Sequence, residues 1–440
     1  MELLTGKIRP LYLKYLVAAS GSAMVASIFG IIDAMMVGQY HGPVGSAALA
    51  VFNPLWSIIF CLGLLAGIGG SVLFANHRGS GNEADAQQYF TLSVLYGIAL
   101  SVIATVGIGL FQDPLFRFFG ADEELLHLAK RYLKPILFAI PCCVFSNILS
   151  AYLRNDNNPH LATISVVIGG IFNFVGDYVC VFLLDLGIFG AGLATAIGQL
   201  IGILIMLIHF FRKKNTLRFV KPSHAFRKLG SISINGFSTA ITDLAMGIIG
   251  ILFNRQIMAH LGADALAVYG VITMLTAFAQ CLAYGAGQAA QPIISQNHGA
   301  GQPARIRQCL KYGLITSIVM GLFWVLVTLL MPNAILRLFM SPTPAVLQIA
   351  PGILRAYGIS FILLPFNIFA TYYFQAMMKA HISMIASLAR GVVVSGFLIL
   401  ALPAITGANS IWYAMLITEV LVAVFGIWHM IKCTRALGNQ

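Results

Sequence analysis

The sequence predicts an all-α membrane protein with twelve transmembrane helices, arranged in two six-helix lobes related by a pseudo-two-fold axis along the membrane normal. Three observations predict this fold: the scarcity of charge, the succession of apolar runs and an internal repeat. Of the 440 residues, 59% are hydrophobic and 9% are charged, whereas a soluble domain carries about 25% charged residues. Because only lipid accepts so apolar a surface, the composition excludes soluble globular, disordered, coiled-coil and disulfide-scaffold proteins.

Twelve apolar runs are long enough to cross a bilayer, which requires about 20 residues. In the first half of the chain they cover residues 11–37, 46–74, 89–111, 132–152, 161–184 and 187–211. In the second half they cover residues 231–254, 264–296, 311–331, 352–378, 382–402 and 409–431.

The basic residues set the predicted orientation. The chain has 26 Lys and Arg against 14 Asp and Glu, a formal net charge of +12. Most of the Lys and Arg residues fall in segments on the same side as the N-terminus. Cytoplasmic loops are enriched in these residues, so we expect a multi-pass protein of the cell (inner) membrane with both termini cytoplasmic. The positive charge then marks cytoplasmic loops, and we expect no nucleic-acid partner.

Weak sequence matches relate the two halves of the chain. Ala50-Val51-Phe52 resembles Ala267-Val268-Tyr269, and Leu115-Phe116-Arg117-Phe118-Phe119 resembles Ile335-Leu336-Arg337-Leu338-Phe339, each about 220 residues away. The residues predict an N-lobe at 1–211, a basic cytoplasmic linker at 212–230 and a C-lobe at 231–440. Because each lobe has an even number of spans, six, both lobes enter the membrane in the same orientation. This predicts an axis along the membrane normal that relates the lobes, and a substrate site near the midplane. Chance similarity between apolar helices remains the alternative.

Motifs of soluble catalysis are missing from the sequence. It has no GxxxxGK[ST] phosphate loop, no HExxH and no GxSxG, so neither ATP hydrolysis nor an intramembrane hydrolase is predicted. The seven cysteines form no CxxC pair, which disfavours a structural zinc site. We therefore expect a protein that is not an enzyme, and whose energy comes from an ion gradient or a partner.

Four acids fall within predicted spans: Asp33, Asp177, Asp243 and Glu419. A carboxylate in hydrocarbon costs at least about 2.5 kcal/mol, so each is a candidate functional group. Asn173 precedes Asp177 by four residues and shares its helix face. A carboxylate beside amide and hydroxyl oxygens suits a small hard cation or a titrating proton. The alternative is hydrogen bonding that joins the helices of the bundle.

The other intramembrane charges differ in depth. Asp33 lies near the outer end of its span, where snorkelling to the interface and an interior role are both open. Asp243 and Glu419 lie nearer the centre of their spans, which favours an interior role. Arg390 lies about eight residues into its span, where it acts as a counter-ion or snorkels inward.

The sequence resembles the multidrug and toxic compound extrusion (MATE) transporters in several motifs. Ile32–Gly38 resembles their "VDxxMVG" signature, and Gly285–Ala300, which includes Gln288, is similar to their eighth-helix "GxGQxxQPIxSxNxGA" pattern. Asn173-xxx-Asp177 matches their "NxxxDP" element with Tyr178 in place of Pro. Leu153–Pro159 resembles their "LRxxGNP" loop, with an Asn in place of Gly.

The resemblance implies a twelve-helix antiporter that exports small lipophilic, often cationic drugs in exchange for H⁺ or Na⁺. It implies an N-lobe cation or proton site, and no other metal site, at Asp33, Asn173, Asp177 and Thr195. It places the seventh-helix acid, usually Glu, at the shorter Asp243, and an acid of the twelfth helix at Glu419. The candidates for substrate binding and C-lobe function are Asp243, Glu419, Gln288 and Arg390. We expect no cofactor besides the coupling ion, no partner besides drug and membrane lipid, and a monomer.

Two other functions remain open at this stage. The wider superfamily includes flippases for lipid-linked oligosaccharides, but an anionic lipid substrate needs several basic residues facing a cavity, and Arg390 is the one basic residue clearly inside a predicted span. A channel or a receptor-like membrane protein belongs to another class. Transport that saturates and follows an imposed gradient separates an antiporter from either.

Overall fold

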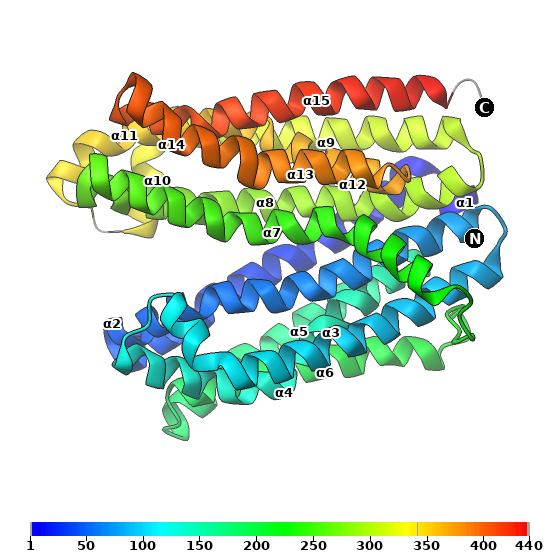
Figure 1. The fold of residues 1–440 in the computed structure, drawn as a ribbon, viewed down its shortest axis with the longest axis horizontal. Helices are drawn as coiled ribbons and strands as arrows, with labels where there is room; N and C mark the ends of the chain where they lie inside the picture. Colours follow the sequence, from blue (N-terminus) through cyan, green and yellow to red (C-terminus); the bar gives the residue numbers. More distant parts are fainter. Residues whose placement is uncertain (1, 341, 438–440) are drawn as a thin grey trace. The chain divides into compact units, whose positions relative to one another are not determined.

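The structure, a computed structural model, describes residues 2–340 and 342–437 of the chain (Figure 1). Over these residues every regular element is a helix, and no strand is present. The all-α fold predicted from the sequence is therefore confirmed.

The first half of the chain forms eight elements. In chain order they are α1 (Glu2–Thr5), α2 (Ile8–Gly79), α3 (Glu83–Phe118), α4 (Glu123–Asn155), α5 (Pro159–Asp177), the π-helix η1 (Tyr178–Leu183), α6 (Ile188–Leu207) and the short η2 (Ile208–Phe211).

The second half begins with α7 (Ala225–His260), α8 (Gly262–Gly299), α9 (Pro303–Leu330), α10 (Pro332–Phe339) and α11 (Pro344–Gly358). It continues with η3 (Ile359–Ile362), α12 (Leu364–Ala376), α13 (Ala380–Leu388), the π-helix η4 (Ala389–Val393), α14 (Val394–Thr406), η5 (Ala408–Tyr413) and α15 (Ala414–Ala436).

The 72-residue α2 contains two membrane spans. A straight helix of that length would extend about 108 Å, more than three times the hydrocarbon thickness of a bilayer. The backbone leaves helical geometry at Gly42, where φ is 65° and ψ is −150°. Glycine populates positive φ without steric cost, so the chain turns there and returns. Among residues 2–340 and 342–437, eleven helical segments are long and apolar enough to span a membrane, with α2 counted once. The two arms of α2 bring the total to the predicted twelve.

Helix starts follow local chemistry. The Asp122 carboxylate accepts a hydrogen bond from the Leu125 amide at 2.9 Å, which caps the first turn of α4. Asn82 caps α3 in the same way through the Asp85 amide, at 3.2 Å. Proline occupies the first helical position of α5, where its missing N–H costs nothing.

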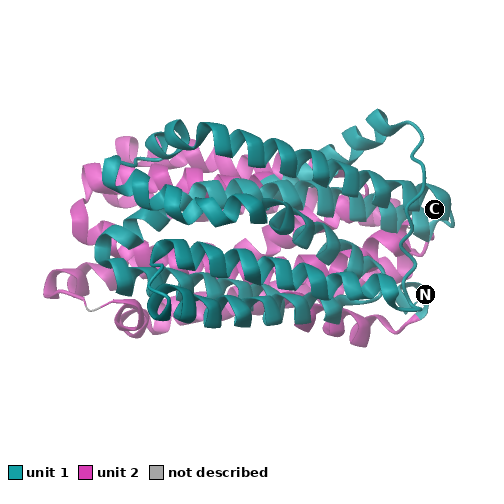
Figure 2. Cartoon of the chain, turned by 90° about the horizontal axis from the view of Figure 1, so that it is seen from below, with its two compact units in different colours: residues 1–5, 21–240 teal, residues 6–20, 241–440 magenta. Residues whose placement is uncertain are grey.

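Internal contacts divide the chain into two compact units (Figure 2). Unit 1 comprises residues 1–5 and 21–240, and unit 2 comprises residues 6–20 and 241–440. The beginning of α2 thus belongs to unit 2, and the first part of α7 belongs to unit 1. The functional boundaries predicted at residues 211 and 231 remain a prediction.

The segment between α6 and α7, predicted as a linker, lies along α3 within unit 1. The side chain of Gln87 donates a hydrogen bond to the Thr216 carbonyl and accepts one from the Arg218 amide, both at 2.8 Å. The Thr91 hydroxyl accepts a bond from the Val220 amide at 3.0 Å. Because α3 side chains satisfy the backbone groups of this extended stretch, residues 215–223 form a strap on unit 1.

Candidate functional site

Two aspartates from different helices meet inside unit 1. Asp33 is 9% exposed in the first arm of α2, and Asp177 is fully buried at the end of α5. Their carboxyl groups lie within hydrogen-bonding range of each other. Two carboxylates within hydrogen-bonding range of each other repel, and a proton or a cation between them relieves that repulsion. The pair is therefore suited to bind one positive charge.

Helix α4 contributes a tyrosine that contacts this pair of aspartates. The Tyr132 hydroxyl donates a hydrogen bond to Asp33 Oδ2 at 2.9 Å. The second carboxylate oxygens, Asp33 Oδ1 and Asp177 Oδ2, are buried, and no donor group of the described residues reaches either one. A buried oxygen without a donor retains a lone pair for an incoming proton or metal ion.

An amide and a hydroxyl complete the polar group. Asn173, one turn before Asp177 on α5, donates to Thr195 Oγ1 of α6 at 3.1 Å. The same amide lies 3.5 Å from Asp177 Oδ1. Its carbonyl oxygen and the Thr195 hydroxyl can act as neutral ligands beside the two carboxylates. The four residues predicted as a coupling site are thus brought together, although their role in coupling remains a prediction.

Tyr132 was missed by the sequence analysis. The apolar run predicted a span beginning at residue 132, which placed this tyrosine at the membrane surface. In the structure α4 begins at Glu123, so Tyr132 lies more than two turns inside the helix and is fully buried apart from 4% of its surface. The signal was the capping residue Asp122, which marks the true start of the helix.

Unit 2 contains the remaining intramembrane acids. Asp243 on α7 accepts a hydrogen bond from the Tyr284 hydroxyl of α8 at 3.0 Å. Glu419 on α15 is fully buried. Its Oε1 accepts a hydrogen bond from Arg390 Nε at 2.8 Å, and its Oε2 accepts one from the Asn367 side-chain amide at 2.6 Å. The structure therefore supports the interpretation of Arg390 as a counter-ion, because its side chain is buried beside Glu419 and does not snorkel to the interface.

Gln288, the other C-lobe candidate, is half-buried on α8. Three residues later on the same helix, Gln291 donates to Gln375 Oε1 of α12 at 3.1 Å. The structure thus separates the C-lobe candidates: Asp243 lies at the α7–α8 contact, and Arg390 with Glu419 lies between η4 and α15.

A further ionic cluster lies at the end of unit 1 predicted to face the cytoplasm. Asp156, directly after α4, accepts hydrogen bonds from Arg78 at 3.0 Å, His209 at 2.7 Å and the Thr216 amide at 2.9 Å. Burial raises the pKa of Asp156, but the hydrogen bonds from His209, Thr216 and Arg78 outweigh burial and hold the pKa below its ordinary value. Asp156 therefore holds the strap as a carboxylate.

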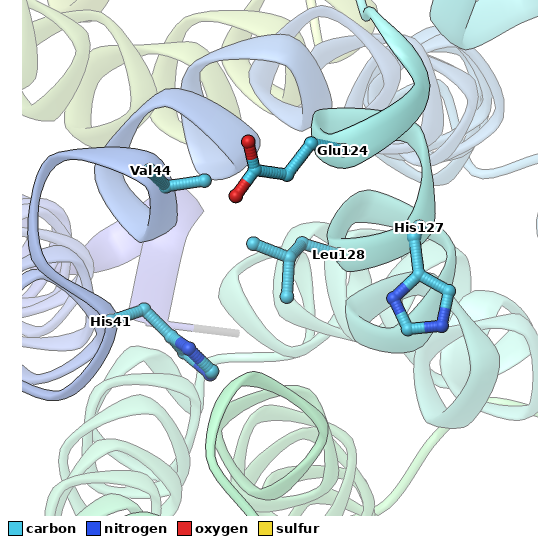
Figure 3. Close-up of a pocket in the computed structure, with 5 residues that line it drawn as sticks. All are labelled: His41, Val44, Glu124, His127 and Leu128. Atoms are coloured by element: carbon cyan, nitrogen blue, oxygen red, sulfur yellow. The ribbon is translucent and has the colours of Figure 1, made fainter.

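A cavity of about 450 Å³ opens at the opposite end of unit 1 (Figure 3). Val44 and His41 line it from the bend of α2, while Glu124, His127 and Leu128 line it from the first turns of α4. His41 Nε2 accepts a hydrogen bond from the Ile188 amide at 3.0 Å, which fastens the bend to the start of α6. His41 follows Asp33 by eight residues, or about 12 Å along a helix, so the cavity is separate from the buried acids.

Comparison with known proteins gives a consistent result. The sequence matches the family described as MatE over residues 19–179 and again over residues 239–399. It is 24% identical over 406 residues to the "Multidrug export protein MepA" of Staphylococcus saprophyticus, covering 91% of this chain and 89% of that protein. It is also 24% identical over 405 residues to the MepA protein of Staphylococcus aureus, covering 91% and 88%.

Solved structures share the fold. A structure described as the outward-facing conformation of a multidrug resistance MATE family transporter of the MOP superfamily superposes with a TM-score of 0.91 at 22% identity, covering all of this chain and 98% of that one. A MOP superfamily transporter from Pyrococcus furiosus, described as having a binding pocket of reverse polarity, gives the same TM-score, identity and coverage. The two matches of the MatE family to one chain also agree with the internal repeat seen in the sequence.

Proposed function

Because the chain belongs to the MATE family of multidrug efflux transporters, we propose that it is an antiporter that exports drugs in exchange for a coupling cation, H⁺ or Na⁺. The observation that carries the proposal is the buried Asp33–Asp177 pair, whose two carboxyl groups share one small volume in unit 1. Two apolar side chains of similar volume would pack at this place at least as well as two buried carboxyl groups. Binding of a cation gives the carboxyl groups a function.

The chemistry of the site fits either ion. Asp33, Asp177, Asn173 and Thr195 provide carboxylate, amide and hydroxyl oxygens, the ligands of a hard cation. The same carboxylates accept a proton, and the Tyr132 hydroxyl orients Asp33 in either case. The residues present therefore fit Na⁺ or H⁺ as the transported ion.

Coupling requires that drug and cation each prefer a different state of the protein. In the proposed cycle, a cation binds Asp33 and Asp177 from outside, favours release of the drug and favours the inward-facing return. A drug molecule bound from inside favours loss of the cation. The reciprocal effect of the two ligands follows from linkage and needs no direct contact between them.

The substrates proposed are small lipophilic compounds, often cationic, as the name "multidrug export protein" of the MepA relatives suggests. Asp243 is a candidate for contact with a cationic substrate, because one of its oxygens is buried and no donor among the described residues reaches it. The proposal includes a monomer in the inner membrane with both termini in the cytoplasm.

Reconstitution tests this proposal. Purified protein in liposomes should expel a fluorescent organic cation when an inward Na⁺ gradient or an inward proton gradient is imposed, and the ion that drives efflux is the coupling ion. Asp33→Asn should abolish gradient-driven efflux without loss of folded protein. Asp264→Asn, which changes an exposed acid at the start of α8, is the matched control. Full efflux by Asp33→Asn, or efflux that follows neither gradient, contradicts the proposal.

A further inference from the structure

Unit 2 contains a buried ion pair in place of a second cation site. Arg390 is 7% exposed and Glu419 is fully buried, and their Nε and Oε1 atoms are 2.8 Å apart. Asn367 donates to the other carboxylate oxygen and to the Glu419 carbonyl, at 2.6 and 2.9 Å. Each oxygen of this carboxylate therefore already has a donor. This arrangement differs from that of Asp33 and Asp177, each of which has a buried oxygen that no donor among the described residues reaches.

Backbone landmarks align the two units residue by residue. Asn157 and Met378, about 220 residues apart, each have a φ of 58° just before α5 and α13 begin. Gly187 and Gly407 have φ of 56° and 99° just before α6 and η5 begin. The MatE family matches, residues 19–179 and 239–399, are displaced by the same distance. These features fix which residue of unit 2 stands for which residue of unit 1.

The polar site of unit 1 has no counterpart in unit 2. The count starts from Gly42 and Gly262, with φ of 65° and 83°, for Asp33, and from the capping residues Asp122 and Thr343 for Tyr132. With these and the landmarks above, all five polar residues are replaced by apolar ones. In the order Asp33, Tyr132, Asn173, Asp177, Thr195 the replacements are Phe253, Ile353, Val394, Leu398 and Met415. Phe253 instead stacks on Tyr269 at 4.8 Å between ring centroids. These five positions of unit 2 thus offer no side-chain oxygen as a ligand.

The ion pair lies one helical turn away from that place. Arg390 stands twelve residues after Met378, as Gly169 stands twelve residues after Asn157. In unit 1 an added Cβ at Gly169 would lie 2.6 Å from the Gly198 carbonyl oxygen, so the two helices touch through their backbones. In unit 2 Arg390 stands at the place of Gly169, and Glu419 stands one residue after Thr418, the counterpart of Gly198. Arg390 also lies in the π-helix η4, a local widening that is frequent at functional sites.

We propose that Arg390 is a built-in cation of unit 2, which permanently neutralises Glu419 and so withholds that carboxylate from the coupling cation. The proposal rests on the proposed function, since it assigns the stoichiometry of the same transport cycle. A free Glu419 would be a buried carboxylate, and such a group takes up a proton or a metal ion rather than stay charged and unpaired. The guanidinium prevents this because it places a positive charge and N–H donors beside the carboxylate.

Removal of the guanidinium should therefore create a second site. Arg390→Gln leaves Glu419 without its counter-ion and should bind one more cation equivalent per molecule than the wild type. The measurement is equilibrium binding of radiolabelled Na⁺ to the purified full-length protein, together with proton uptake followed at constant pH. Arg390→Lys retains the charge and should bind the wild-type number. Equal binding by Arg390→Gln and the wild type would overturn the proposal.

A double variant protects the test against misfolding. Arg390→Gln with Glu419→Gln removes both charges, and neutral replacement of a buried pair is tolerated far better than loss of one partner. This variant should bind the wild-type number of cations. Loss of one bound cation would show that Glu419 is itself a cation site in the wild type and would overturn the proposal.

The two proposals fail in different ways. Asp33→Asn, measured alongside, should bind one cation fewer than the wild type. If it does not, cation coupling at unit 1 fails, while the difference between Arg390→Gln and the wild type still decides the role of the ion pair.

Discussion

The Tyr132 hydroxyl of α4 donates a hydrogen bond to Asp33 Oδ2 of α2 across 2.9 Å, although the two residues are 99 positions apart in the chain. The other oxygen of the same carboxylate, Oδ1, has no hydrogen-bond donor among the described residues. One oxygen is thus fixed and the other is available. The hydrogen bond from Tyr132 thus links α4 to the proposed coupling site.

Tyr132→Phe should impair coupling while the fold is retained. The substitution removes one hydroxyl and leaves the ring, which packs edge to face against Phe52 at 4.8 Å between centroids. A hydrogen bond to a charged group contributes roughly 1.5–3 kcal/mol, so we expect gradient-driven efflux to fall about tenfold or more. Efflux from proteoliposomes measures this. Tyr178→Phe, which changes an exposed hydroxyl on η1, should behave as the wild type, and equal rates for both variants would contradict the assignment.

Thr195→Val should distinguish the two coupling ions. Valine has nearly the shape of threonine but lacks the hydroxyl oxygen that accepts the Asn173 amide at 3.1 Å. A metal ion needs every ligand oxygen, whereas a proton needs one carboxylate. We therefore expect the Na⁺ concentration that half-saturates transport to rise about tenfold, with a smaller effect on efflux driven by a pH gradient. An equal effect on both gradients would show that Thr195 positions Asp177 and does not contact the ion.

The sequence predicted the number of spans and the all-helical fold because both follow from local hydrophobicity. It also predicted that Asn173 and Asp177 share a helix face, since spacing within one helix is set by helical periodicity. Helix ends were less accurate. Hydrophobicity reports where lipid begins, and the polar first turns of α4, capped by Asp122, extend beyond that point, which is why Tyr132 was missed.

Tertiary pairing of charges could not be predicted. Arg390 and Glu419 are separated by 29 residues and lie on different helices, and nothing in the local pattern of either span specifies its partner. The same holds for the strap, which composition describes as a basic polar linker. Its attachment depends on Asp156, Gln87 and Thr91, three side chains that become neighbours only when the helices pack.

Gly169→Ala should destabilise unit 1. A Cβ at this position would lie 2.6 Å from the Gly198 carbonyl oxygen, a backbone atom that can move only if α5 and α6 separate. Overpacking of this kind costs about 1–3 kcal/mol, so the apparent Tm in detergent should fall by several degrees. Gly107→Ala on α3 is the matched control, because no atom lies within 4 Å of its added Cβ. A Tm for Gly169→Ala equal to that of the control would mean that the two helices are not in backbone contact.

Asp156→Asn should release the strap from unit 1. The carboxylate accepts hydrogen bonds from Arg78, His209 and Thr216, and an amide at that place can satisfy only part of this set of donors. Trypsin should then cleave after Arg218 more than tenfold faster than in the wild type at neutral pH. Asp264→Asn, an exposed acid of α8, should leave the cleavage rate unchanged.

The same contact predicts how the wild-type strap responds to pH. The pKa of Asp156 is held below its ordinary value, because hydrogen bonds from His209, Thr216 and Arg78 outweigh the effect of burial. A carboxyl whose folded pKa is depressed stabilises the fold above its unfolded pKa, about 3.9 for Asp, and loses that contribution as the pH falls through the folded value. Strap attachment should therefore be constant from neutral pH down to about 5 and weaken only below about 4. Hydrogen exchange of the backbone amides of residues 212–224, compared between the wild type and Asp156→Asn at each pH of this range, measures it. The difference between the two proteins should shrink toward zero at the acid end, and a difference that persists there would mean that the side chain holds the strap without its charge.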